Sequence, residues 1–146
     1  MKSVLICASL FASAALFAAE ADPAAQKVNY VDSDHVTQVL GKGGTMIDGS
    51  DFAVQGTHRV KPGNVEIHLK ETDVFYVTDG EATVVTGGTV QGRHETRANQ
   101  VGGTAIEGGE TFHLKKGDVM TIPAGVPHWF KETNGISYYV VKVKKP

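Results

Sequence analysis

The sequence has a single cysteine among its 146 residues, and that residue, Cys7, lies in an apolar stretch at the N-terminus. A chain with one cysteine has no internal disulfide framework, and removal of the N-terminal stretch would leave no thiol nucleophile. Charge of one sign is also lacking, since 14 basic residues face 16 acidic ones, for a formal net charge of -2. That balance gives no electrostatic footprint for nucleic acid, so we expect no nucleic-acid partner. Any catalysis must therefore rely on histidines, carboxylates or a metal ion.

Long hydrophobic runs are confined to the first residues of the chain. Lys2 precedes an apolar segment, Val4–Ala19, and Ala19-Glu20-Ala21 fits the small-x-small pattern of a cleavage site. This arrangement predicts a secretory signal peptide over residues 1–21 and a periplasmic or secreted protein. The alternative is an N-terminal membrane anchor, but a spanning helix needs about 20 apolar residues. We therefore expect no membrane association after signal cleavage.

The rest of the chain has the pattern of an all-β protein. Residues 22–50 form a leader in which Ser33 or Asp34 can cap a short helix that ends at Leu40, before a glycine cluster. From residue 51 to 146, strand-like segments alternate with turn sequences such as Asp79-Gly80 and Asn134-Gly135. The expected strands are 52–60, 65–69, 74–77, 82–86, 111–115, 119–122, 128–131 and 136–143. Many short strands at this spacing predict one antiparallel sandwich or barrel domain.

One glycine-rich segment, residues 87–110, interrupts this rhythm. It contains polar residues such as Arg93, His94, Glu95 and Arg97, and has little that we expect to be buried. Two readings remain open. The segment is either a solvated hairpin insertion or a flap over the mouth of the barrel, because long loops in compact domains often serve as lids.

The most informative pattern runs from Gly117 to His128. Glycine turns flank a short strand, and Pro123 and Gly125 redirect the backbone just before His128 begins the next strand. The spacing Gly-x5-Pro-x-Gly-x2-His resembles the second motif of the cupin superfamily and matches it at all four fixed positions.

A second cluster of polar residues lies upstream. Glu66 and His68 are two residues apart on an expected strand, so they share one face, and Asp73 shares a face with Phe75. This region resembles the first cupin motif, with His68 at its second histidine, Asp73 at its glutamate and Gly80 at its closing glycine. Glu66 stands where the motif has its first histidine, and the opening glycine is not matched.

The resemblance implies a small all-β cupin domain, a double-stranded β-helix or jelly-roll barrel with a short N-terminal helix, holding one divalent metal ion. Its ligands would be His68, Asp73 and His128, with Glu66 as a fourth. Such a donor set suits Fe or Mn and also accommodates Zn, Ni or Cu. Two alternatives stay open: Glu66 is a catalytic general base rather than a ligand, and Asp73 holds His68 rather than the metal. A barrel that has lost its metal is the remaining interpretation.

Other residues are candidates for the substrate pocket. His58 and Phe130 could line the site together with Phe75, although both aromatic residues also suit the core. The basic residues 142–145 are expected at a solvated strand end. These features favour a metalloenzyme of the dioxygenase, isomerase or lyase type that acts on a small polar substrate. The alternative is a non-catalytic module that binds a small ligand, with a structural metal or none; either form could be a homodimer.

Overall fold

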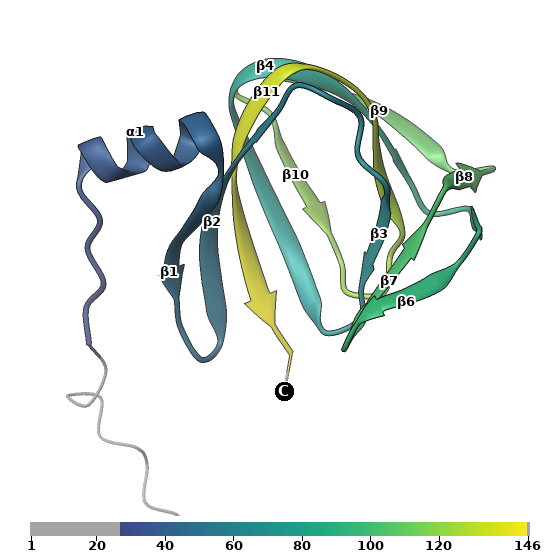
Figure 1. The fold of residues 1–146 in the computed structure, drawn as a ribbon, viewed down its shortest axis with the longest axis horizontal. Coiled ribbons are helices and arrows are strands. Elements are labelled where there is room, and N and C mark those ends of the chain that lie inside the picture. Colours follow the sequence, from purple (N-terminus) through teal and green to yellow (C-terminus); the bar gives the residue numbers. More distant parts are fainter. Residues whose placement is uncertain (1–26, 146) are drawn as a thin grey trace, which may run out of the picture.

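The computed structural model describes residues 27–145, so the predicted signal peptide lies outside the described residues. This part of the chain has one short helix and eleven strands, most of them in a curved antiparallel sheet (Figure 1). The elements are α1 (Ser33–Lys42), β1 (Gly44–Asp48), β2 (Phe52–Arg59), β3 (Val65–His68), β4 (Glu71–Thr86), β5 (Thr89–Gln91), β6 (His94–Arg97), β7 (Gln100–Gly103), β8 (Ala105–Glu107), β9 (Glu110–Lys115), β10 (Val119–Ile122) and β11 (His128–Lys144).

The predicted N-terminal helix is present and lies to one side of the barrel (Figure 1). Asp32 caps it by accepting a hydrogen bond from the backbone N–H of His35 at 2.8 Å, and Gly43 ends it with a φ of 81°. Val39 is its buried residue and faces the backbone of Gly56 on β2. No helix within residues 27–145 has the length and apolar character needed to cross a membrane.

Two long strands, β4 and β11, organise the barrel. They pair antiparallel along almost their whole length, and they curve together over the top of the molecule in Figure 1. β11 also pairs with β2 and β3, while β4 pairs with β9 and β10. This curved antiparallel arrangement confirms the expected jelly-roll barrel. The sheet begins at Gly44, because β1 pairs with β2, and so it includes part of the segment 22–50 assigned to the leader.

The prediction that Asp79-Gly80 and Asn134-Gly135 end strands is wrong. β4 and β11 continue through both positions, and β11 is irregular in register between Asn134 and Ser137. Gly80 has a φ of 69° and Gly135 a φ of 59°, and the two backbones are so close that a Cβ at Gly80 would overlap the Gly135 carbonyl. The glycines therefore bend two paired strands together, where turns between separate strands were expected.

We expect Gly80→Ala to destabilise the protein by about 3 kcal/mol, because it adds a steric overlap to the cost of a positive φ. Gly87→Ala is the matched control: Gly87 has nearly the same φ, 70°, but open space where its Cβ would lie. That variant should lose only about 1 kcal/mol. Denaturant unfolding of both variants checks the prediction, and equal losses would contradict the close contact between Gly80 and Gly135.

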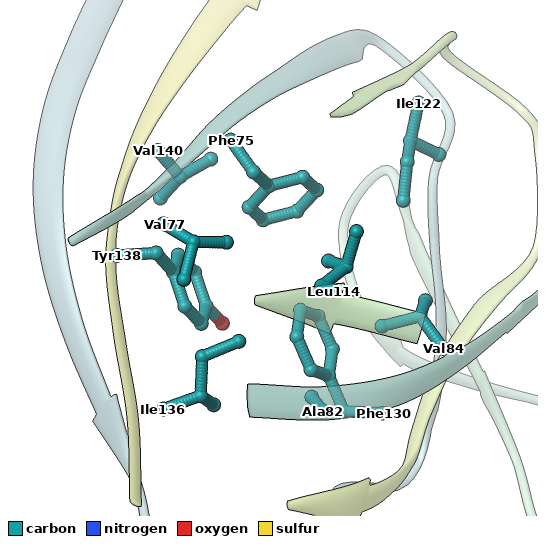
Figure 2. Close-up of a cluster of buried hydrophobic side chains, with 10 residues drawn as sticks. All are labelled: Phe75, Val77, Ala82, Val84, Leu114, Ile122, Phe130, Ile136, Tyr138 and Val140. Carbon is teal, nitrogen blue, oxygen red and sulfur yellow. The ribbon is translucent and has the colours of Figure 1, made fainter. Parts of the chain in front are cut away.

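The main hydrophobic core is a cluster of ten buried side chains (Figure 2). It is made mostly by alternate residues of β4 and β11, as expected for strands with one buried face. Its members are Phe75, Val77, Ala82, Val84, Leu114, Ile122, Phe130, Ile136, Tyr138 and Val140.

The expectation that residues 87–110 contain little buried structure is wrong. The segment forms β5–β8, and β7 extends the main sheet by pairing with β3. Val101 and Ile106 are buried, and Ile106 packs with Val65 and Val85 in a second, smaller core cluster. The segment is therefore part of the barrel wall, and β7 brings its residue Gln100 opposite His68.

Candidate metal centre

Strand β3 presents two polar side chains to the barrel interior. Glu66 and His68 share one face of this strand, as predicted, while Val65 and Ile67 on the other face are buried in apolar surroundings. His128 is the first residue of β11 and pairs directly with Glu66 across the sheet. The register between β3 and β11 thus brings the two distant motifs together.

The turn before β11 fixes the position of His128. The backbone N–H of Gly125, which has a φ of 87°, donates to the His68 carbonyl at 2.8 Å. On the other side, the Gly87 N–H donates to the Pro127 carbonyl at 2.9 Å. The turn is therefore tied both to β3 and to the end of β4, so the delivery of His128 depends on backbone contacts as well as on its own strand.

Glu66, His68 and His128 form a group that could hold a metal ion. One ligand-type atom from each residue lies within 4.8 Å of the others, and the rings of His68 and His128 have centroids 5.2 Å apart. Glu66 Oε2 lies 3.9 Å from His128 Nε2. Two imidazoles and one carboxylate are a donor set that divalent transition metals accept.

Asp73 lies next to this group but has a different partner. Both of its carboxylate oxygens accept hydrogen bonds from Lys142 Nζ, at 2.8 and 3.0 Å. Its Oδ2 lies 3.4 Å from His68 Nε2. Lys142 also approaches Glu71, at 3.4 Å. Asp73 therefore contacts His68 while its charge is balanced by a buried lysine.

Burial makes both histidines weak bases. The pKa of His128 falls to about 4, chiefly because the ring is desolvated and secondly because it lies near His68. Desolvation also lowers the pKa of His68, and the positive charge of Lys142 adds to this effect. For Asp73, burial raises the pKa and the hydrogen bonds from Lys142 oppose that rise. Both imidazoles are therefore neutral at pH 7, which is the form that binds metal.

The lowered pKa of His128 predicts a pH-dependent stability of the metal-free protein. In the unfolded chain this histidine takes up a proton near pH 6.5, but in the folded chain it does so only near pH 4. The free energy of unfolding should therefore decrease as the pH is lowered, by about 2 kcal/mol between pH 7 and pH 5.

This contribution is measured by unfolding the wild type and His128→Gln in denaturant with a chelator present, at several pH values. The Asp73 carboxyl, whose raised pKa acts in the opposite direction, is present in both proteins, so the comparison measures His128 together with its charge interaction with Asp73. The glutamine variant should lose less stability on acidification than the wild type. Parallel curves would show that His128 is not held neutral by its surroundings.

A small cavity of about 160 Å³ contains this cluster. Phe75 and Phe130 line it, and they also belong to the hydrophobic core. The prediction that His58 lines the site is not supported. Its side chain is exposed on the other face of β2, with Nδ1 2.8 Å from the Ser137 hydroxyl. Its neighbours Thr57 and Arg59 reach the cavity instead.

Several polar residues of the cavity were not identified from the sequence. Lys142, placed at a solvated strand end, is only 9% exposed. Arg59 Nε donates to the Tyr138 hydroxyl at 2.9 Å, and Arg59 lies 5.0 Å above the Phe130 ring. Gln100 Nε2 is 3.4 Å from Glu66 Oε1. The alternation of side chains along β11 could have predicted the burial of Lys142, because this residue shares a face of the strand with Tyr138 and Val140.

The family model for the cupins matches residues 22–146. The chain belongs to the cupin family. Among solved structures, this cupin resembles BH2720 from Bacillus halodurans, with 14% identity, a TM-score of 0.55 and coverage of 80% of this chain and 82% of that one. It also resembles NMB1881 from Neisseria meningitidis, with 14% identity, a TM-score of 0.50 and coverage of 83% and 91%. No curated protein matches the chain.

One similar structure is an enzyme, the DMSP lyase DddQ from Ruegeria pomeroyi. It is 14% identical with a TM-score of 0.50, and the match covers 70% of this cupin and 46% of the lyase. At such low identity, these likenesses show the fold. The residues of this cupin fit a metal on their own chemistry, because two neutral imidazoles and one carboxylate converge at a cavity.

Proposed function

We propose that this cupin binds one divalent transition-metal ion through Glu66, His68 and His128 and is an enzyme that acts on a small polar substrate. The observation that carries the proposal is the convergence of these three side chains, within 4.8 Å, at the wall of a cavity. Two histidines and one carboxylate that leave coordination positions open suit Fe(II) and accommodate Mn, Zn, Ni or Cu. A closed structural site would usually have four protein ligands.

In this proposal, Asp73 orients His68 and does not bind the metal. The two hydrogen bonds from Lys142 occupy its carboxylate, and its contact with His68 Nε2 is the kind of support that ligating imidazoles commonly receive. Glu66 is then the single anionic ligand. A divalent ion there would keep a net positive charge and could polarise a substrate oxygen or lower the pKa of a bound water.

The surrounding side chains hold the proposed ligands in place. Arg59 lies 3.9 Å from Glu66 Oε2 and Gln100 lies 3.4 Å from its Oε1, so both carboxylate oxygens have polar neighbours. The rings of Phe75 and Phe130 form an apolar part of the wall, which limits the access of water on that side. Burial raises the pKa of Tyr138, so its phenol stays protonated near neutral pH.

We also propose that the protein is exported to the periplasm or beyond. The support is the apolar N-terminal segment followed by a small-x-small sequence at residues 19–21. N-terminal sequencing of the protein recovered from its source cells would test this, with a first residue near Asp22 expected. An intact N-terminus beginning at Met1 or Lys2 would contradict it.

The enzymatic proposal is tested by turnover with defined metals. Protein stripped with a chelator and reloaded separately with Fe(II), Mn(II), Zn(II), Ni(II) or Cu(II) is incubated with a panel of small hydroxy acids, keto acids and sugars, and products are followed by NMR. We expect at least one compound to be converted only by a metal-loaded wild-type protein, and not by His68→Ala. Metal binding without conversion of any compound would instead support a non-catalytic binding module.

A further inference from the structure

A second cavity adjoins the metal centre. Its volume is about 520 Å³, against about 160 Å³ for the cavity that contains the three proposed ligands, and we call them the outer and the inner cavity. Five side chains line both of them: Gln55, His68, Arg97, Gln100 and Lys142. Because the two cavities share these five side chains, they lie next to each other.

The outer cavity is strongly basic, although the chain as a whole is slightly acidic. Only two acidic residues line it, Asp48 and Glu71. The basic residues that line it are Lys70, Arg97, Lys142, Lys144 and Lys145. A concave surface lined by one sign of charge concentrates ligands of the opposite sign.

Three of these basic residues are available to a ligand. Lys142 is paired with Asp73 and Glu71, and Lys144 is paired with Asp48 at 2.8 Å. By contrast, Lys70, Arg97 and Lys145 form no ion pair with a carboxylate of residues 27–145. The Lys145 N–H donates to the Lys70 carbonyl at 2.8 Å, so these two lysines lie side by side.

Arg97 is held in an orientation that links the two cavities. Its Nε donates to Gln100 Oε1 at 2.6 Å, which leaves the terminal nitrogens of the guanidinium group for another partner. The amide of Gln100 in turn lies 3.4 Å from Glu66, one of the proposed metal ligands. A planar guanidinium group with two free nitrogens is well suited to a carboxylate or phosphate.

The small size of the inner cavity indicates that a ligand would occupy the inner and the outer cavity together. The inner cavity, at about 160 Å³, has less than a third of the volume of the outer cavity, at about 520 Å³. A bound metal ion would take up part of that smaller space. The rest of the ligand would extend into the outer cavity, where it meets Arg97 and the two lysines.

We propose that the substrate class of this site is a small organic acid with two anionic groups. One end of the molecule reaches the metal centre, and the distal anionic group binds in the outer cavity to Arg97, Lys70 and Lys145. This inference rests on the proposed metal-dependent function, which it narrows to dianionic substrates. It also gives residues 87–110 a role, because β6 supplies Arg97 and β7 supplies Gln100.

The test compares ligands that differ only in the distal charge. Glutarate and its monoamide, glutaramate, are titrated calorimetrically into Zn(II)-loaded protein at an ionic strength of about 0.01 M, where screening is weak. The wild type should bind glutarate at least about 10-fold more tightly, because hydrogen bonds to charged groups contribute more than neutral ones. In Arg97→Gln/Lys70→Gln this preference should fall below about 3-fold. The control Lys116→Gln removes a charge in the β9–β10 turn, outside both cavities, and should change nothing.

Metal content measured on the same samples separates the two proposals. Protein that holds its metal but binds both compounds equally, or binds neither, overturns the assignment of the outer cavity and leaves the metal site standing. Protein that binds no metal but still prefers glutarate through Arg97 and Lys70 refutes the metal site and supports the outer cavity. A preference that survives in the double variant also overturns the assignment.

Discussion

Replacement of His128 by alanine is expected to abolish tight metal binding while leaving the fold intact. His128 supplies one of three proposed ligands, is 3% exposed and is held by backbone contacts on both sides of its turn. Removing a residue that hydrogen-bonds a metal ligand typically lowers metal affinity 10- to 100-fold, so removing a ligand itself should lower it more than about 100-fold. Competition of the protein with a chromophoric chelator measures the dissociation constant directly.

Two further variants sharpen this prediction. His113→Ala removes an exposed histidine that lies outside the metal-binding group, and its affinity should match that of the wild type. Glu66→Ala should lose metal almost as completely as His128→Ala if its carboxylate is a ligand. A Glu66 variant that keeps its metal but loses turnover would instead identify this residue as the general base. Unchanged affinity in His128→Ala would contradict the proposed centre altogether.

Replacement of Lys142 by methionine is expected to destabilise the metal-free protein by about 3–5 kcal/mol. The substitution keeps the apolar stem but removes the ammonium group that donates two hydrogen bonds to Asp73, which is itself only 3% exposed. An isolated buried carboxylate is far more costly than a buried pair. The free energy of unfolding in denaturant, measured with a chelator present, gives the loss.

Lys144→Met is the matched control, because Lys144 lies on the same strand and pairs with the largely exposed Asp48. Such an exposed pair contributes less than about 1 kcal/mol.

The stability lost in Lys142→Met should also become smaller as the pH is lowered. Without the lysine, the raised pKa of Asp73 rises further, so the folded protein binds a proton that neutralises the buried carboxylate. Lys142→Met/Asp73→Asn should recover much of the stability at pH 7. A loss as small as that of the control would contradict the buried pair.

The fold could be predicted because its signals are local. The alternation of Glu66 and His68 with Val65 and Ile67 fixed which face of β3 is polar, and the turn chemistry from Gly117 to Gly125 indicated where β11 begins. The glycine at position 80 was misleading. Gly-containing pairs usually end strands, and only the close approach of Gly80 to Gly135 explains why two long strands bend together here.

The candidate site was only partly accessible from the sequence. Its three proposed ligands belong to recognisable motifs, but Lys142, Arg59 and Gln100 reach it through the register between strands far apart in the chain. Lys142 lies opposite Asp73 because β11 pairs with β4 in one particular register, and Gln100 lies opposite His68 because β7 adds to β3. Register depends on packing of the whole sheet, so no local pattern specified these contacts.

Anomalous diffraction from crystals loaded with a single metal would locate the proposed metal ion itself. With data collected at the absorption edge of that metal, we expect one strong peak per chain, bounded by the carboxylate of Glu66 and the imidazoles of His68 and His128. No peak at this position in crystals soaked with each of the five candidate metals, or a peak ligated by other residues, would contradict it.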